Sequence, residues 1–325
     1  HAFFSERAVS KVPGLKGVEP RGIDSVGVIG GGTMGAGIAI AVMSAGLPVT
    51  MVERDEESLE RGRANVERIL DGSVKRGRIT AEQKAATLER YFRGSVDYSA
   101  FADVDLVIEA AFEDMDVKKE IFRKLDETVR SGAVLATNTS YLDINEIAAV
   151  TSRPQDVIGL HFFSPANIMK LLEIVVADET APDVVATGFA LAKRLKKIGV
   201  RAGVCDGFIG NRILATYRKQ ADYLMEDGAS PYEIDKAVRE FGFAMGPYQV
   251  ADLAGLDIGW ATRKRLAPTR DPNERYVTVS DRICERGWFG QKTGRGFYLY
   301  PEGARIGTPD PEVEAIIETE RKAAG

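Results

Sequence analysis

The chain has 325 residues, of which 44% are hydrophobic and 28% charged, and its formal net charge is -5. At about 150 residues per domain, this length predicts two domains with a sizeable core. The negative charge argues against binding to nucleic acid or to an anionic membrane surface, and no apolar run approaches the roughly 18 residues of a membrane span. Two cysteines without CxxC spacing and one internal histidine argue against a disulfide framework and a transition-metal site, so a reducing compartment is expected.

From Ser25 to about Gly203, short β-branched runs alternate with helical patterns, which is typical of βαβ units on a parallel sheet. Strands are predicted at residues 25–30, 48–54, 105–111, 133–138, 157–163 and 170–177. Helices are predicted at residues 34–46, 56–77, 80–92, 113–132 and 181–197. The expected fold class is therefore α/β, with a doubly wound, mostly parallel Rossmann-type sheet followed by a smaller all-helical domain.

Beyond Gly203, helical patterns dominate. One helix start is marked by Ser230 as N-cap, Pro231 at the first helical position and Glu233 three residues after the cap. The expected organisation is a linker at 1–22, a dinucleotide-binding domain at 23–203, a helical domain at 204–302 and a connector tail at 303–325 that has no core to join. Because the chain starts with His1 rather than Met, we expect a fragment of a longer protein.

A glycine-rich turn, Gly30-x-Gly32-x-x-Gly35, follows the first predicted strand and opens a helix of small residues. The first glycine would form the tight turn, the second would let the backbone approach a pyrophosphate, and the third would let helix and strand pack closely. Glu53 ends the next strand, where a carboxylate accepts hydrogen bonds from a ribose and repels a 2′-phosphate, so NAD is favoured over NADP. The neighbouring Arg54 weakens that preference. The alternative is a purely structural turn with Glu53 as a solvated charge.

His161, the one internal histidine, lies in an apolar stretch, GLHFFSPANIMKLLEI, that also contains Glu173. A fold-back centred on Asn167 would place position 161 opposite position 173. A carboxylate there would accept a hydrogen bond from the imidazole, fix its tautomer and stabilise the imidazolium. We therefore expect a general base that removes an alcohol proton while hydride leaves the same carbon for a nicotinamide. The alternatives are a structural histidine and a charge on an edge strand.

Polar residues in two further segments are candidates to hold a substrate oxygen. Asn138, Thr139 and Ser140 follow a predicted strand, at the edge where doubly wound sheets bind ligands. Asn211 lies on the first helix predicted in the second domain. Their hydroxyl and amide groups would suit a substrate hydroxyl or a thioester carbonyl in the transition state, although each alone is more simply explained as a cap or surface residue.

Together these stretches resemble the 3-hydroxyacyl-CoA dehydrogenase family, in particular the dehydrogenase part of multifunctional β-oxidation enzymes of the peroxisomal and bacterial type. The resemblance implies oxidation of an L-3-hydroxyacyl-CoA to the 3-ketoacyl-CoA, with NAD as the cofactor, in fatty-acid β-oxidation. It runs in family order from about Gly27 to Tyr298 and rests on GVIGGGTMGAGIA, VIEAAFEDMDVKKEIF, ATNTSYLDINEIA, VIGLHFFSPANIMKLLEIV, GFIGNRI, FGFAMGPYQVADLAGLDIGW and FGQKTGRGFY.

Position by position, the resemblance implies that His161 is the catalytic base and Glu173 its partner, with Ser140 and Asn211 contacting the reacting end of the substrate. Ser164 stands where the family often has Asn. In addition to the glycine turn, the implied cofactor contacts are Met34, Glu53, Glu113, Lys118, Ser140 and Ser164.

The resemblance also implies partners. Residues 2–15 are similar to the linker after an enoyl-CoA hydratase/isomerase domain, which is expected to be covalently linked in the full-length protein, and the expected substrate is an acyl-CoA. Lys75, Arg76 and Arg78 lie in the family's CoA-facing region, where they would bind adenosine phosphates or form a solvated basic surface.

The resemblance leaves the assembly open between a homodimer through the helical domain and pairing of that domain with a second helical repeat. A bacterial chain would be cytoplasmic and a eukaryotic one peroxisomal.

Two other functions remain open. Another oxidoreductase on the same scaffold, such as a 3-hydroxyacid or 6-phosphogluconate-type enzyme, would normally use a lysine base and gives no reason for the pairing of His161 with Glu173. A dinucleotide-binding or structural protein without turnover, like the lens crystallins related to this family, is opposed by the presence of all the candidate catalytic residues.

Overall fold

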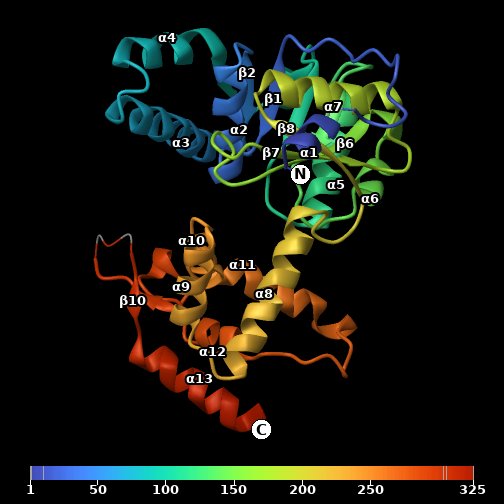
Figure 1. The fold of residues 1–325 in the computed structure, drawn as a ribbon. Helices are drawn as coiled ribbons and strands as arrows, with labels where there is room; N and C mark the ends of the chain where they lie inside the picture. The colour runs from blue at the N-terminus through green and yellow to red at the C-terminus, as the bar shows by residue number, and fades with distance from the viewer. Residues whose placement is uncertain (1, 10, 303, 305, 325) are drawn as a thin grey trace. The chain divides into compact units, whose positions relative to one another are not determined.

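The computed structural model describes residues 2–9, 11–302, 304 and 306–324. Positions 1 and 10 of the predicted linker, and positions 303, 305 and 325 of the predicted tail, lie outside the described residues. The chain divides into two compact units, residues 1–212 and 213–325 (Figure 1). The first unit extends beyond the predicted boundary at Gly203, because Phe208 and Ile209 pack into its core.

The first unit is built on an eight-stranded sheet with the order β3-β2-β1-β4-β5-β6-β7-β8. The strands from β3 to β6 run parallel, whereas β7 is antiparallel to β6 and β8 is parallel to β7. Their bounds are β1 Val26–Ile29, β2 Val49–Val52, β3 Phe92–Ser95, β4 Leu106–Glu109, β5 Val134–Thr137, β6 Val157–Phe162, β7 Leu171–Val176 and β8 Ile198–Gly203. The predicted α/β class with a mostly parallel sheet is confirmed.

Strands β3 and β8 were missing from the sequence prediction. Both are edge strands, and each has a neighbouring strand on one side only. Their sequences, FRGS and IGVRAG, contain arginine and glycine instead of a β-branched run, because an edge strand leaves side chains exposed to solvent.

Helices cover both faces of the sheet, and Figure 1 shows α7 on the opposite side of the strands from α5 and α6. One apolar cluster joins the strands to α2, α3 and α7, and a second joins them to α5 and α6. Side chains along a strand alternate between these clusters: Ile158 and Leu160 belong to the first, and Val157 to the second. His161 shares the parity of Val157 and therefore points to the side of α5 and α6. The helices of this unit are α1 Ala2–Ala8, α2 Thr33–Ser44, α3 Glu56–Lys75, α4 Ala81–Tyr91, α5 Met115–Thr128, α6 Ile144–Ala148 and α7 Pro182–Arg194.

The described residues of the second unit are mostly helical and include a short antiparallel ladder of two strands, β9 Tyr298–Leu299 and β10 Thr308–Pro309. The predicted helix start at Ser230 is confirmed, since its side chain accepts from the backbone of Glu233 and the Glu233 side chain accepts from the backbone of Ser230. Helix α8 starts in the first unit and continues into the second. The helices are α8 Gly210–Glu226, α9 Pro231–Phe241, α10 Pro247–Ala254, α11 Leu256–Leu266, α12 Val279–Glu285 and α13 Pro311–Ala324.

The expectation that the tail has no core to join is wrong for α13. Val313, Ile316 and Ile317 are buried in the same apolar cluster as Met225 and Ile283. Their spacing puts them on one face of the helix, while the many charged residues between them face solvent and hide the pattern in the linear sequence. None of the helices in the described part of the chain is both long and apolar enough to cross a membrane.

Candidate active site

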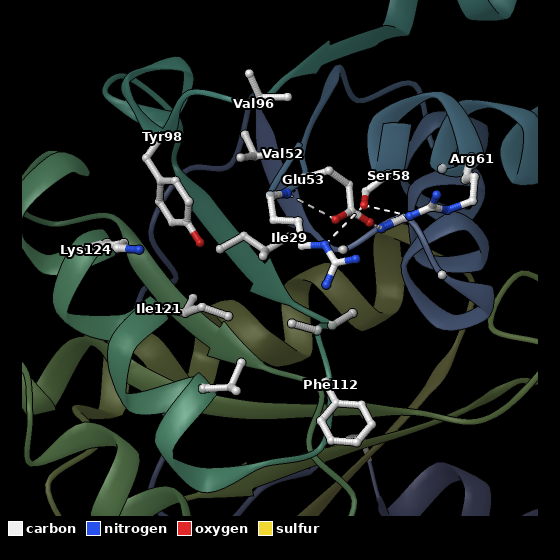
Figure 2. A pocket seen from close by; sticks show the side chains of 18 of the residues that line it. Ile29, Val52, Glu53, Ser58, Arg61, Val96, Tyr98, Phe112, Ile121 and Lys124 are labelled. Atoms are coloured by element: carbon white, nitrogen blue, oxygen red, sulfur yellow. Dashed lines mark hydrogen bonds between the residues drawn. The ribbon is translucent and has the colours of Figure 1, made fainter. Parts of the chain in front are cut away.

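The candidate residues gather at one edge of the sheet, because the parallel strands β2, β1, β4, β5 and β6 all end there. The chain leaves β1 toward β2 and β3 on one side and returns to β4 on the other. Such a reversal of strand order is where doubly wound sheets bind ligands. A pocket of about 1300 Å³ opens at this point, and it is lined by residues from the ends of β1, β2 and β4 and from α3 and α5 (Figure 2).

The glycine turn has the geometry that a dinucleotide loop needs. Gly30 adopts φ +90°, and a Cβ atom there would lie 2.7 Å from the carbonyl oxygen of Ala110. A Cβ atom on Gly35 would lie 1.7 Å from the Gly30 carbonyl oxygen, so helix α2 can approach the strand only with glycine at this position. Gly32 is the N-cap of α2 and faces open space. Met34 is half-buried in the first turn of α2. Gly30 and Gly35 thus take the turn and packing positions expected of them, and the expected approach of a pyrophosphate at Gly32 stays a prediction.

Glu53 lies just beyond β2 and lines the pocket. Its Oε1 accepts a hydrogen bond of 2.6 Å from the backbone N–H of Gly31. On the other side of the loop, the Asn65 side chain of α3 donates to the Gly31 carbonyl oxygen at 2.8 Å. The carboxylate is therefore held at the position where a Rossmann fold binds the adenosine ribose.

His161 and Glu173 face each other across the antiparallel pair β6 and β7, in the register expected from the fold-back. Imidazole Nδ1 lies 2.7 Å from Glu173 Oε2, and both side chains are buried. A carboxylate can only accept, so Nδ1 carries the proton and Nε2 is left with its lone pair. In this tautomer Nε2 is the ring nitrogen that accepts a hydrogen bond.

The Glu173 carboxylate is also held by the start of α8. Its Oε1 accepts from the backbone N–H of Gly210 at 2.7 Å and of Ile209 at 3.1 Å. Burial would raise the pKa of Glu173, but the hydrogen bond from His161 and those from the two backbone N–H groups outweigh burial and lower this pKa below its ordinary value. Glu173 therefore carries its negative charge at neutral pH.

Ser140 lies on the other side of the imidazole, with its Oγ 3.1 Å from Nε2 of His161. The turn that presents Ser140 is organised by Glu113. Glu113 Oε1 accepts from the backbone N–H of Ser140 at 2.7 Å, from that of Tyr141 at 3.1 Å and from the Thr139 hydroxyl at 2.6 Å. Ser140, His161 and Glu173 thus form a continuous chain of hydrogen bonds.

Two aromatic rings pack beside the imidazole. The ring centroids of Phe163 and Phe208 lie 4.5 Å and 5.5 Å from that of His161. Phe208 has φ +46°, which is uncommon for a bulky residue, and its side chain is completely buried. These rings exclude water from part of the imidazole and strengthen its interaction with Glu173.

Glu109 is a site residue that the sequence prediction missed. It ends β4, is fully buried and pairs with Lys118, whose Nζ lies 2.7 Å and 2.9 Å from the two carboxylate oxygens. It also accepts from the Thr137 hydroxyl and the Ala111 N–H, both at 2.7 Å. Lys118 is 1% exposed, and its Nζ lies 3.4 Å from Glu113. The ion pair therefore supports the residue that holds the Ser140 turn. In the sequence, Glu109 can be recognised only as a glutamate at the end of an apolar strand.

Other predicted residues are not joined to this cluster by a described hydrogen bond. Asn211 is half-buried in the first turn of α8, next to Gly210, and no hydrogen bond in the described part of the chain links its side chain to His161 or Ser140. Ser164 is exposed in the loop after β6. Lys75 ends α3, and Arg76 and Arg78 follow it before α4; all three are exposed and do not line the pocket.

Comparison with known proteins gives two matching family models. The model for the NAD binding domain of 3-hydroxyacyl-CoA dehydrogenase matches residues 25–205, and the model for the C-terminal domain of 3-hydroxyacyl-CoA dehydrogenase matches residues 207–300. The peroxisomal bifunctional enzyme of Cavia porcellus is 44% identical over 99% of this chain and 46% of its own length. The peroxisomal fatty acid beta-oxidation multifunctional protein MFP2 of Arabidopsis thaliana is 39% identical over 100% of this chain and 45% of its own length. The chain thus spans about half the length of these curated relatives.

Two solved structures of shorter proteins are also similar. M. tuberculosis FadB2 superimposes with a TM-score of 0.81 at 37% identity, covering 86% of this chain and 100% of that one. The (S)-3-hydroxybutyryl-CoA dehydrogenase PaaH1 from Ralstonia eutropha gives a TM-score of 0.80 at 37% identity, covering 86% of this chain and 100% of that one. Both domains of the present chain therefore have counterparts in proteins without the additional length.

Proposed function

Since the chain belongs to the 3-hydroxyacyl-CoA dehydrogenase family, we propose that it oxidises the 3-hydroxyl group of an L-3-hydroxyacyl-CoA to a ketone, with NAD as hydride acceptor, in fatty-acid β-oxidation. The observation that carries this proposal is the hydrogen-bond chain from Ser140 through His161 to Glu173, at the same sheet edge as the glycine loop. A lysine-based oxidoreductase would have no use for that chain.

The residues at the loop fit NAD. The N-terminus of α2, with Gly32 facing open space, offers backbone N–H groups to a pyrophosphate, and Glu53 offers a carboxylate to the ribose hydroxyls. When bound, NAD supplies the nicotinamide carbon that takes the hydride. By position, we also assign cofactor contacts to Met34, Glu113 and Ser164. Lys118 is buried, so it acts on the cofactor site by orienting Glu113.

His161 acts as the general base. The substrate O–H bond breaks as its proton moves to Nε2, the carbon–oxygen double bond forms, and the hydride departs from the same carbon. Glu173 keeps Nδ1 protonated and stabilises the imidazolium that results. Ser140 Oγ, which lies at Nε2, donates to the reacting oxygen, and the Asn211 amide donates to the thioester carbonyl. General-base assistance of this kind contributes about 10²–10⁴-fold to the rate.

An acyl-CoA is the proposed substrate, and we propose two further partners. The curated relatives are about twice as long as this chain, which supports a covalently linked enoyl-CoA hydratase/isomerase domain in the full-length protein. The helical unit is proposed to form a homodimer or to pair with a second helical repeat. We propose a cytoplasmic location for a bacterial source and a peroxisomal one for a eukaryotic source, since the relatives named above are peroxisomal proteins.

The proposed function is tested by mixing the protein with acetoacetyl-CoA and NADH and following NADH absorbance. We expect rapid NADH oxidation and, in the reverse direction, reduction of NAD by L- but not D-3-hydroxybutyryl-CoA. Folded protein that binds NADH but turns over neither substrate would favour a dinucleotide-binding protein without turnover.

The exposed basic residues at the end of α3 and in the turn after it allow a separate test of CoA recognition. Replacing Lys75, Arg76 and Arg78 together with alanine should raise KM for acetoacetyl-CoA about tenfold with little change in kcat, because exposed charges contribute at most about 1 kcal/mol each. The effect should shrink at high salt. As a control, the KM for a truncated thioester without the adenosine phosphates should not change. An unchanged KM for acetoacetyl-CoA would mean that these side chains are only a solvated surface.

A further inference from the structure

The loop between β6 and β7, residues 163–170, connects the strand that carries His161 to the strand that carries Glu173. Most of this loop is exposed, and even the apolar side chains of Ile168 and Met169 are 56% and 42% exposed. Burial of apolar surface therefore holds little of the loop in place, and its position depends on a few specific contacts.

Ala166 is the one buried residue of this loop, and it packs on α2. A Cβ atom on Gly37, in the second turn of α2, would lie 3.1 Å from the Cβ atom of Ala166 and 3.2 Å from its backbone nitrogen. The loop thus runs from the strand of His161 to the helix that follows the glycine turn. Ser164, a proposed cofactor contact, lies between these two points along the chain.

Lys197 holds two carbonyl groups of the same loop. Its Nζ donates to the carbonyl oxygens of Ala166 and Met169, both at 2.6 Å. Inside the loop, the Pro165 carbonyl oxygen accepts two bonds from backbone N–H groups. In the described part of the chain, the two bonds from Lys197 are the only hydrogen bonds that join residues 164–169 to the rest of the first unit.

The environment of Lys197 is unusual for a lysine. Its side chain is half-buried, its Nζ lies 5.4 Å from the centroid of the Phe162 ring, and burial lowers the pKa of Lys197. Among the described residues, no carboxylate forms an ion pair with it. A buried ammonium without a counterion costs free energy unless its protons are accepted, and the two carbonyl oxygens accept them here. Lys197 is therefore neither a solvated surface charge nor half of an ion pair.

We propose that Lys197 is a positioning residue that fixes the loop between β6 and β7 and so holds Ser164 at the nicotinamide half of the cofactor site. The loop begins at Phe163, whose ring centroid lies 4.5 Å from that of His161, so a displaced loop would also alter the surroundings of the imidazole. The inference rests on the cofactor site of the proposed function, and its test measures binding instead of turnover.

The test compares NADH with ADP-ribose, which lacks the nicotinamide. Lys197→Met removes both hydrogen bonds and keeps much of the apolar stem. We expect this variant to bind NADH about tenfold more weakly in a fluorescence titration, and to bind ADP-ribose within a factor of about two of the unaltered protein in a calorimetric titration. Lys193→Met is the matched control, because Lys193 is exposed in the last turn of α7 and the variant makes the same change in net charge. It should leave both affinities unchanged.

A chemical rescue separates the loss of the ammonium group from a folding defect. Lys197→Cys should show the same selective loss of NADH affinity. Alkylation of this variant with 2-bromoethylamine rebuilds an ammonium side chain of nearly the same length and should restore most of that affinity. Cys205 and Cys284 are free thiols that can also react, so the unaltered protein receives the same treatment and should keep its affinity.

The outcomes distinguish this inference from the proposed function. Unchanged NADH affinity in Lys197→Met overturns the inference. An equal loss of NADH and ADP-ribose affinity also overturns it, because such a loss indicates a loosened unit and not a displaced loop. The same holds if alkylated Lys197→Cys regains no NADH affinity while the treated unaltered protein keeps its own. NADH binding by the unaltered protein without turnover of acetoacetyl-CoA overturns the proposed function and leaves the inference standing.

Discussion

Replacement of His161 by glutamine should lower kcat for acetoacetyl-CoA reduction by about 10²–10⁴-fold, because an amide cannot exchange a proton with the substrate oxygen. The substitution keeps the approximate size of a side chain that is packed against Phe163 and Phe208. His161 does not line the dinucleotide pocket, so NADH affinity should remain within a factor of about two. Steady-state kinetics and an NADH titration on the same preparation check both parts.

The matched variant is Glu173→Gln, which removes the negative charge but preserves the shape. It should lower kcat less than His161→Gln, because the imidazole keeps its place as the base but the imidazolium that forms on proton transfer loses the neighbouring negative charge that stabilises it. The hydrogen bonds that lower the pKa of Glu173 keep this residue ionised in the unaltered protein, so the glutamine variant removes a negative charge that is present at neutral pH. An unchanged kcat in His161→Gln would show that His161 is not the general base.

The His161 and Glu173 pair could be predicted because the constraint is local. A short connection between two apolar runs fixes the register of an antiparallel pair, and the period of two along each strand then puts both side chains on one face. The glycine turn was predictable for the same reason, since Gly30 and Gly35 act within one strand, turn and helix. The sheet class followed from the regular alternation of strands and helices.

The Glu109 and Lys118 pair could not be predicted in the same way, because its burial depends on elements far apart in the chain. β4 lies between β1 and β5, and Glu109 becomes inaccessible only when those strands flank it. A glutamate that ends a strand has the same sequence pattern whether it is solvated or enclosed. The burial of α13 was missed for a similar reason, since Val313 meets Met225 of α8 only in the folded unit.

Replacement of Glu109 by alanine should lower the free energy of unfolding of the first unit by about 3–5 kcal/mol, because it leaves the ammonium of Lys118 buried without its main counterion. Lys118 is 1% exposed and cannot reach water without moving α5. Both tryptophans, Trp260 and Trp288, lie in the second unit, so tryptophan fluorescence would report the unfolding of that unit. Unfolding of the first unit is measured by far-UV circular dichroism in denaturant together with hydrogen exchange at the β4 and β5 amides.

A double variant, Glu109→Ala with Lys118→Met, separates the charge from the packing. Removing both ions should restore most of the lost stability, because a buried ion pair offers little advantage over apolar groups of similar volume. Glu120→Ala is the control. Glu120 pairs with Lys124 on the exposed face of α5, the helix that also carries Lys118, so this variant should leave the unfolding of the first unit unchanged.

If the double variant were as unstable as Glu109→Ala, the hydrogen bonds to Thr137 and Ala111 would be the stabilising contacts. If Glu109→Ala lost less than about 1 kcal/mol, Glu113, at 3.4 Å from Nζ, would be sufficient as a counterion.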